Sequence, residues 1–267
     1  MTNKTIYLIG GTSIANAAAA RLEGEGHRVV VSVATALGEE RAAQAGLETD
    51  AGRKKAAEIG RRAGELGAAA IVDCSHPFAE EASRQAKEAA GAAGLPYLRY
   101  CRAPSPLAAA ADSIISTDSF EAAAESARAI GGPALLTLGT RHLELFVRAG
   151  VALTVRVLPL AGSIEECRRL GIAPAEIIAA WPPFTADFNR ACLRRAGAAT
   201  LVTKDSGREG GLELKLEAAA AEGVTAIVVS RPPQPDAIHD LETLAVRLTA
   251  ALATRQARPE SEPGPGA

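Results

Sequence analysis

The chain has few aromatic residues and almost no excess of charge. Aromatic side chains make up 3% of its 267 residues, so its cores must be built from alanine, valine, leucine and isoleucine. Lysine and arginine number 29 against 31 acidic residues, for a formal net charge of -2. So small a net charge gives no broad electrostatic attraction to nucleic acid or to an anionic membrane surface. We therefore expect no nucleic-acid partner and no membrane partner.

Cysteine is also scarce, and no apolar run is long. The four cysteines stand far apart without a C-x-x-C pair, which argues against a zinc site or a disulfide framework, and we expect no bound metal. No apolar run approaches the ~20 residues that a membrane helix needs. A glycine turn is reached within ten residues, leaving no room for a signal peptide before it. The sequence thus predicts a cytoplasmic protein with reduced thiols.

What the chain does contain is an alternation of short apolar strands with helices rich in alanine, glutamate and arginine. This pattern predicts an α/β fold with mainly parallel sheets flanked by helices. Strands are expected at residues 5–9, 28–33, 47–51, 69–73, 97–100, 134–138, 153–158, 176–180, 200–203 and 226–229. We expect an N-terminal domain over 1–103, a C-terminal α/β domain over 104–253 that includes a last helix near 240–253, and a disordered tail over 254–267.

The first strand runs directly into Gly10, Gly11, Thr12 and Ser13 and then into an alanine-rich helix. Backbone N–H groups and hydroxyls at the start of a helix suit a pyrophosphate. A tight turn in which Thr12 or Ser13 caps the helix explains the same residues about as well. The turn alone leaves both interpretations open.

The end of the second strand indicates which dinucleotide would bind. Sites for NAD usually place a carboxylate there, and this chain has none before Glu39. Ser32 and Thr35 can accept a 2′-phosphate, and Arg53 can supply a positive charge. These residues favour NADPH over NADH. The alternative is that Arg53 is a solvated residue at the start of a helix.

The fourth strand leads into Ser75, His76, Pro77 and Phe78. The usual strand order places this strand beside the first, so the loop would flank the crevice where such sheets bind ligands. His76 is a candidate proton donor there, and a structural role for it is about equally favoured. Ser75 and Pro77 would lie against the cofactor.

A second polar loop starts at Lys204 and Asp205 and continues through Ser206, Gly207, Gly210 and Gly211. Lys204 is expected to contact a phosphate or a substrate carboxylate, and Asp205 to orient it or to bind the ligand. Glycines in such a loop let a ligand approach the backbone. The alternative is an ion pair at a strand end. Arg141, after another strand, is a candidate for binding a substrate carboxylate.

Together these segments resemble the precorrin-6A reductase family of cobalamin biosynthesis, which includes cobalt-precorrin-6A reductases. The resemblance covers residues 6–232 and is carried mainly by the GGTS turn, the segments SHPFA at 75–79 and RVLP at 156–159, and TKDSG with its following glycines at 203–211. It implies two Rossmann-like lobes with a ligand cleft between them, the first binding NADPH and the second capping cofactor and substrate.

The resemblance further implies NADPH-dependent reduction of one double bond in the precorrin-6A macrocycle, giving precorrin-6B. His76, Lys204 and Asp205 are then the candidate catalytic residues, with the proton coming from His76, Asp205 or solvent. Arg141 and Arg208 are candidate partners of the carboxylates of the tetrapyrrole substrate. Transient contact with neighbouring enzymes of the pathway is also expected.

Two other functions use similar elements. A methyltransferase that uses S-adenosylmethionine also has a glycine turn after its first strand, but normally an acidic residue ends its second strand. A non-catalytic dinucleotide sensor would use the glycine loops as a switch. The whole set of motifs favours the reductase hypothesis.

Overall fold

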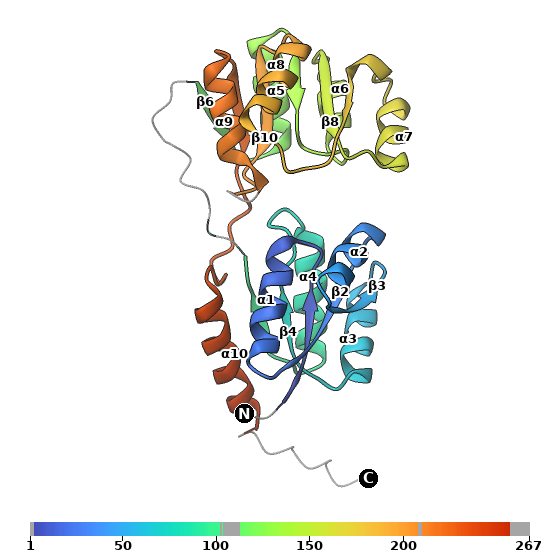
Figure 1. The fold of residues 1–267 in the computed structure, drawn as a ribbon, viewed down its shortest axis with the longest axis vertical. Coiled ribbons are helices and arrows are strands. Elements are labelled where there is room, and N and C mark those ends of the chain that lie inside the picture. Colours follow the sequence, from blue (N-terminus) through green and yellow to red (C-terminus); the bar gives the residue numbers. More distant parts are fainter. Residues whose placement is uncertain (1–2, 102, 104–112, 208–209, 257–267) are drawn as a thin grey trace, which may run out of the picture. The chain divides into compact units, whose positions relative to one another are not determined.

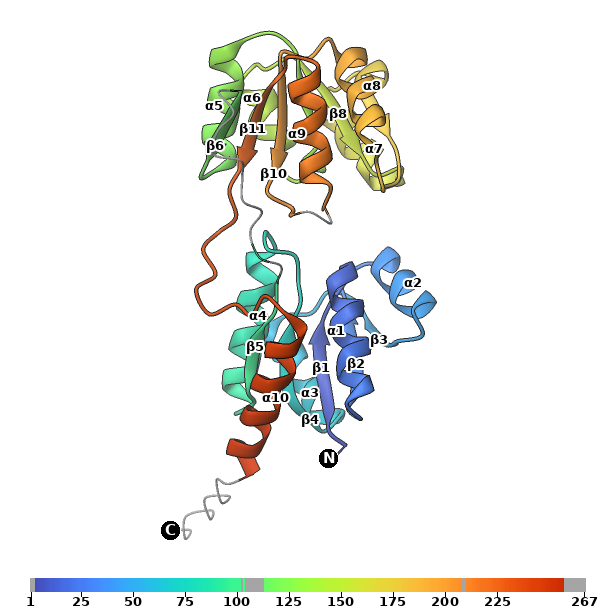
Figure 2. The same ribbon diagram turned by 60° about the vertical axis from the view of Figure 1, so that its left-hand side comes forward.

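The computed structural model describes residues 3–101, 103, 113–207 and 210–256. The chain forms two compact units, which we call unit 1 (Met1–Ala103 with Pro233–Ala267) and unit 2 (Pro104–Pro232). Each unit is a parallel sheet flanked by helices, as Figures 1 and 2 show. The predicted α/β class is therefore confirmed.

Unit 1 alternates strands and helices around a sheet of order β3-β2-β1-β4-β5, and every pair in it is parallel. Its elements are β1 (Thr5–Ile9), α1 (Ser13–Gly24), β2 (Arg28–Val33), α2 (Ala36–Gln44), β3 (Glu48–Ala51), α3 (Ala56–Glu65), β4 (Ala68–Asp73), α4 (Glu80–Ala92), β5 (Tyr97–Arg99) and α10 (Leu241–Gln256). The predicted placement of the fourth strand beside the first is confirmed. The carboxyl ends of β1 and β4 therefore lie together at one edge.

The two faces of this sheet bury different helices, because side chains alternate along each strand. Ile6 and Leu8 face a core shared with α1 and α10. Tyr7 and Ile71 face the other core, which includes alanines of α3 and α4. Small alanine side chains let these helices pack closely on the sheet, which is how a chain poor in aromatics still builds a core.

The last helix, α10, belongs to unit 1, whereas we expected it in the C-terminal domain. Leu244 and Leu248 are 0% exposed and pack in the same core as Ile6. The chain returns there through Ile238, whose N–H donates to the carbonyl of Arg99 at 2.8 Å. The apolar pattern shows that a helix exists but not which sheet it covers. Of the predicted disordered tail, residues 254–256 lie in α10, and residues 257–267 lie outside the described residues.

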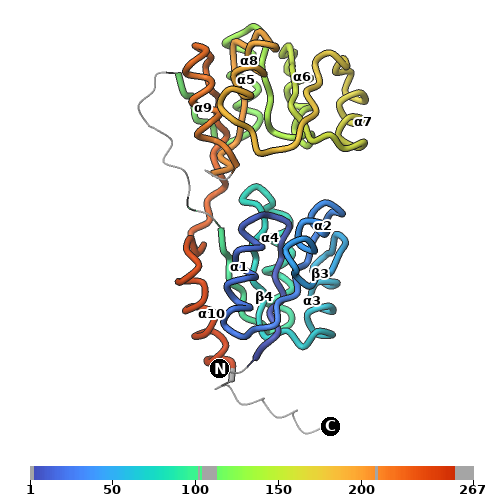
Figure 3. The backbone as a smooth tube through the Cα atoms, viewed as in Figure 1, coloured from blue at the N-terminus to red at the C-terminus, as the bar shows by residue number. Residues whose placement is uncertain are grey.

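Unit 2 is built around a sheet of order β6-β11-β10-β7-β8-β9, again parallel throughout. Its elements are β6 (Ile114–Thr117), α5 (Phe120–Ile130), β7 (Ala134–Leu136), α6 (Leu143–Arg148), β8 (Leu153–Val157), α7 (Ala161–Arg169), the short 3-10 helix η1 (Pro174–Glu176), β9 (Ile177–Ala179), α8 (Ala186–Ala196), β10 (Thr200–Lys204), α9 (Leu212–Ala221) and β11 (Thr225–Val229). Leu135, Leu193 and Leu201 lie in its core with alanines of α9. Figure 3 traces the backbone through both units.

Three elements were not predicted from the sequence: strand β6, helix α2 and the short helix η1. Strand β6 pairs with β11. It was missed because its four residues follow a stretch rich in alanine and proline, which is typical of a connection between two domains. Helix α2 is capped at its N-terminus by Thr35, whose side chain we expected to face a ligand. Within the described part of the chain, no helix has the length and apolar composition needed to span a bilayer.

Candidate functional site

The turn between β1 and α1 requires glycine at two positions. A Cβ at Gly10 would lie 2.4 Å from Cγ1 of Val31, which is far inside van der Waals contact. Gly11 has a φ of +108°, a conformation that side-chain-bearing residues rarely adopt. A Cβ there would meet nothing within 4 Å, so the space in front of Gly11 is open. The turn therefore leaves the start of α1 accessible to an anion.

Thr12 has the capping role that we considered as the alternative. Its Oγ1 accepts a hydrogen bond from the N–H of Ala15 at 3.4 Å and donates one to the carbonyl of Cys74 at 3.1 Å. The N–H of Cys74 in turn donates to Ile9 at 2.8 Å. The turn at 10–13 and the loop at 75–78 are thereby held side by side, as predicted. Ser13 is exposed at the first turn of α1.

The residues proposed for the 2′-phosphate have different surroundings. Ser32 is 7% exposed and hydrogen-bonds the hydroxyl of Tyr7, and Thr35 accepts from Gly38 N–H at 3.1 Å as the N-cap of α2. Both hydroxyls are thus engaged within the protein. Arg53, just after β3, is exposed, while Lys54 beside it binds the carboxylate of Asp50 at 3.1 Å. Arg53 is the cation of this group that extends into solvent.

A buried cluster positions the loop after β4. Asp73 is 0% exposed and accepts hydrogen bonds from Ser75 N–H at 2.9 Å and from the hydroxyl of Tyr97 at 2.8 Å. Arg99 lies 3.1 Å from the same carboxylate and donates to Ser75 Oγ at 3.3 Å. Burial and the charge of Asp73 raise the pKa of Tyr97 well above its ordinary value, so its proton stays on oxygen. Sequence reasoning missed this cluster.

His76 and Pro77 follow Ser75 in this loop. His76 is half-buried, and its Nδ1 accepts a hydrogen bond from the N–H of Phe78 at 3.2 Å. The carbonyl of Pro77 accepts from the side-chain amide of Gln234 at 3.0 Å, so the segment that leads to α10 also supports the loop. The loop is held from both sides, with the ring of His76 partly accessible.

In unit 2, Asp205 is paired with Arg231. The guanidinium lies 3.0 Å from the Asp205 carboxylate, both side chains are 6–7% exposed, and Gly207 N–H donates to the same carboxylate at 3.1 Å. The strand-end ion pair that we considered as the alternative therefore exists, but Arg231 rather than Lys204 is the described partner. These contacts hold the start of the loop, and the role of Asp205 in orienting Lys204 or binding the ligand stays a prediction.

The rest of this loop is tightly folded. Ser206 Oγ donates a hydrogen bond to the carbonyl of Gly210 at 3.2 Å. A Cβ added at Gly210 would lie 2.1 Å from Ser206 Oγ, so no larger residue fits there. Gly207 and Gly211 have φ values of +73° and +69°. Arg208, a candidate for substrate binding, lies outside the described residues. Glycine is thus required by the loop itself at these three positions.

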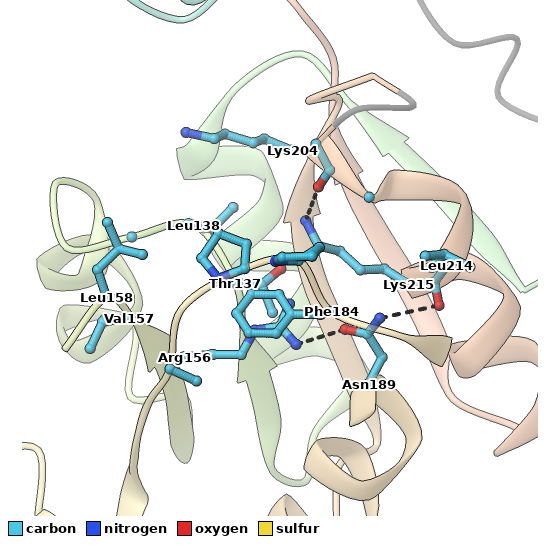
Figure 4. Close-up of a pocket in the computed structure, with 16 residues that line it drawn as sticks. Thr137, Leu138, Arg156, Val157, Leu158, Phe184, Asn189, Lys204, Leu214 and Lys215 are labelled. Carbon is cyan, nitrogen blue, oxygen red and sulfur yellow. Dashed lines mark hydrogen bonds between the residues drawn. The ribbon is translucent and has the colours of Figure 1, made fainter. Parts of the chain in front are cut away.

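A pocket of about 440 Å³ opens at the carboxyl edge of the unit 2 sheet, and Lys204, Gly210 and Gly211 line it. Figure 4 shows its side chains, which come from the ends of β7, β8 and β10, from α8 and α9, and from the segments that precede these two helices. The other lining residues are Thr137, Leu138, Gly139, Arg156, Val157, Leu158, Ala180, Pro182, Pro183, Phe184, Asn189, Leu214 and Lys215. The carboxyl edge of a parallel sheet is where such folds bind ligands.

Three cations line this pocket, and none of its described lining residues is acidic. Arg156 is 6% exposed, donates to Asn189 Oδ1 at 2.6 Å and lies 4.2 Å from the ring centre of Phe184. Lys215 is 7% exposed and donates to Thr203 Oγ1 and to the carbonyl of Gly210, both at 3.3 Å. Two of the three cations of the pocket, Arg156 and Lys215, are therefore buried with neutral hydrogen-bond partners.

The electrostatics of the pocket follow from this arrangement. Burial, then the charges of Arg156 and Lys204, lower the pKa of Lys215 to about 7. Burial and the charge of Arg141 lower the pKa of Lys204. Burial and the same arginine, with Lys204, also lower the pKa of His142. Arg141 is exposed after β7 and close enough to act on both groups, so it adds to the positive field.

Sequence reasoning missed Arg156, Asn189 and Lys215 as site residues, although two of them carry a signal. Arg156 stands between two valines in a mostly apolar strand, and Lys215 stands between two leucines in α9. A cation on an apolar face is rarely buried without a reason. Asn189 has no such signal, because an asparagine in a polar helix is unremarkable until the helix is placed.

These features can be compared with known proteins. The family model described as precorrin-6x reductase CbiJ/CobK matches residues 5–252. The chain belongs to this family. The predicted family is thus confirmed, and the chain is a reductase of the oxidoreductase class rather than a methyltransferase.

Individual relatives agree with this assignment. The chain is 37% identical over 232 residues to a cobalt-precorrin-6A reductase of Priestia megaterium, covering 85% of this chain and 90% of the relative. It is 35% identical over 236 residues to a cobalt-precorrin-6A reductase of Salmonella typhimurium, covering 87% and 89%. A solved structure, CobK precorrin-6A reductase, superposes with a TM-score of 0.74 at 24% identity over 94% of this chain and 98% of the other, which supports the fold.

Proposed function

We propose that this protein reduces one double bond of the precorrin-6A macrocycle, in its cobalt-containing form, with NADPH as the hydride donor. The family match over residues 5–252 carries the proposal. Relatives at 33–37% identity are named for the cobalt-containing substrate, while those named for precorrin-6A are 29% identical over about two thirds of the chain. This difference favours cobalt-precorrin-6A, and the cobalt-free form is the second candidate.

The reaction balances without any further reactant. One hydride and one proton add across a carbon–carbon double bond, which becomes a single bond, and NADP⁺ is released. NADPH when bound supplies the hydride, so the protein must bind both partners, align them and exclude water. We place the reaction in the cytoplasm, because the four cysteines are buried and form no disulfide among the described residues, as expected in a reducing compartment.

Unit 1 has the features that a phosphorylated dinucleotide needs. Gly10 and Gly11 keep the backbone close to any phosphate at the start of α1, and Ser13 is exposed beside them. Arg53 would contact the 2′-phosphate, because it is exposed after β3, at the strand edge next to β2. Ser32 and Thr35 would support that site through the backbone they hold.

The other candidates divide into ligand-facing and positioning residues. His76 is our candidate for delivering the proton, because its loop is fixed by Asp73 and Gln234 while its ring is partly accessible. Lys204 and Arg141 would attract the acidic substrate. Asp205 would act through the loop that it holds with Arg231.

Anaerobic assays with purified protein test this proposal. Cobalt-precorrin-6A and precorrin-6A are each mixed with NADPH or NADH, and nucleotide oxidation is followed together with the mass of the product. We expect turnover with NADPH and a product two hydrogens heavier, faster with the cobalt form. Binding of S-adenosylmethionine without any nucleotide oxidation would refute the proposal, and NADPH binding without turnover on either macrocycle would favour a sensor.

A further inference from the structure

We infer that the unit 2 pocket is an oxyanion-binding site in which Arg156 and Lys215, together with Lys204, hold a carboxylate or a phosphate group. This deepens the proposed function, since the acidic macrocycle and the phosphorylated cofactor are the two sources of such a group. The inference starts from the two most buried cations of the pocket, whose described partners are all neutral.

Burying a cation without a counter-ion is costly, and burying two side by side is more so. The neighbours of Arg156 are an amide oxygen at 2.6 Å, two phenyl rings at 4.2 Å and 5.9 Å, and the thiol of Cys192, with which it shares a hydrogen bond. Lys215 has one hydroxyl and one carbonyl. Neutral acceptors lower the cost of burial but do not cancel charge. An oxyanion in the pocket would cancel it.

Among the described residues, no carboxylate forms an ion pair with Arg156 or Lys215. On α8, Asp187 is exposed, and on α9, Glu213 and Glu217 are exposed. Glu222 pairs with Arg190 at 2.8 Å, and Asp205 pairs with Arg231. From β8 and β10 the charged groups that face Lys215 are the cations Arg156 and Lys204. The positive charges of Arg156 and Lys215 are therefore left for a ligand.

The shape of the pocket suits an anion carried on a larger molecule. Figure 4 shows Arg156 and Lys215 beside Phe184, with Leu138 and Leu158 on the facing side. The volume of about 440 Å³ exceeds what one carboxylate or phosphate group needs. The cations would bind the acidic group, and the apolar lining residues would contact the rest of the ligand. That ligand would be either a carboxylate arm with the edge of the macrocycle or a phosphate with its attached sugar.

Binding at this site must be linked to protonation of Lys215. With a pKa near 7 in the empty pocket, this amine is mostly neutral at pH 8. An anion favours its charged form, so binding at pH 8 takes up a proton, and affinity falls as the pH rises above 7. A lysine that only fills space would produce neither effect.

Calorimetric titration of the full chain tests the inference without any turnover. The probes are tricarballylate, which represents a carboxylate arm, and sulfate, which represents a phosphate, because both are fully ionised at pH 8. We expect Lys215→Met and Arg156→Met each to weaken at least one probe by about tenfold, the size expected for one charged hydrogen bond. Arg148→Met, at an exposed position of α6 outside the pocket lining, is the matched control and should bind like wild type.

The two sources are separated with the natural ligands. If Lys215→Met raises the KM for the macrocycle and leaves the NADP⁺ affinity unchanged, the bound group is a substrate carboxylate. If it weakens NADP⁺ binding and leaves the KM for the macrocycle unchanged, the bound group is a cofactor phosphate. If Lys215→Met does not fold, proton uptake by wild type, measured in two buffers of different ionisation enthalpy, decides instead. No binding of either probe, equal binding by the variants, or binding without proton uptake would overturn the inference. Since these titrations involve no reduction, the site can stand if the proposed reaction fails, and the reaction can stand if the site fails.

Discussion

Units 1 and 2 both gather charged side chains at the carboxyl edge of a parallel sheet, but they neutralise those charges differently. In unit 1, Asp73 and Arg99 pair at 3.1 Å, and Asp50 is paired with Lys54 and Arg62. In the unit 2 pocket, Arg156 and Lys215 have neutral described partners. Paired charges hold the loops of unit 1 in place, whereas we infer that a ligand neutralises Arg156 and Lys215. The predictions below test this contrast.

The largest effect should come from removing one partner of the buried pair in unit 1. Asp73→Ala leaves Arg99 charged and buried and removes acceptors from Ser75 and Tyr97. We expect a loss of about 3–5 kcal/mol in the free energy of unfolding, measured by urea denaturation. Arg84→Ala removes exposed ion pairs on α4 and should change stability little. Equal losses in the two variants would show that the Asp73 cluster does not hold unit 1 together.

Overpacking the glycine turn should have the next largest effect. Gly10→Ala places a methyl group 2.4 Å from Val31, so the turn or strand β2 must shift. We expect a loss of about 1–3 kcal/mol in stability and weaker NADPH binding, measured by denaturation and by fluorescence titration. Gly24→Ala, where a Cβ would meet nothing within 4 Å, is the control. Unchanged binding in a folded Gly10→Ala variant would place the cofactor elsewhere.

Arg53 should determine the choice between the two nicotinamide cofactors. Arg53→Ala should weaken NADPH by about tenfold, as expected for one charged contact to the 2′-phosphate, and leave NADH unchanged. Direct titration with both nucleotides measures this. Lys87→Ala, an exposed cation on α4, should affect neither. If NADPH and NADH weaken equally, Arg53 does not contact the 2′-phosphate.

The smallest predicted effect is a pH dependence of stability that originates in unit 2. The pKa of Lys215 is lowered to about 7 in the folded protein, so between pH 7 and its unfolded value the unfolded chain binds more protons. Without ligand, stability should therefore rise with pH, by roughly 1 kcal/mol from pH 7 to 8. Urea denaturation at both pH values measures this. The rise should disappear in Lys215→Met, and its persistence there would assign it to another group.

Much of the fold could be predicted because it depends on local pattern. Strands such as β1 and β2 are short apolar runs bounded by polar residues, and the glycine turn marks where β1 ends. The candidate residues that glycines mark, around Gly10 and Gly210, were found for the same reason. Asp73 and Arg99 were missed, because nothing in the sequence shows that residues 26 apart meet at the ends of neighbouring strands.

The sequence by itself determined the α/β class, the order of most elements and the family, because each depends on residue types at short spacings. Only the tertiary structure decided that α10 covers the sheet of unit 1, that Asp205 pairs with Arg231, and that Arg156 and Lys215 share one pocket. These facts concern which distant surfaces meet. The spacing of apolar residues shows that a face will be buried, but the partner of that face is set by packing across the whole unit.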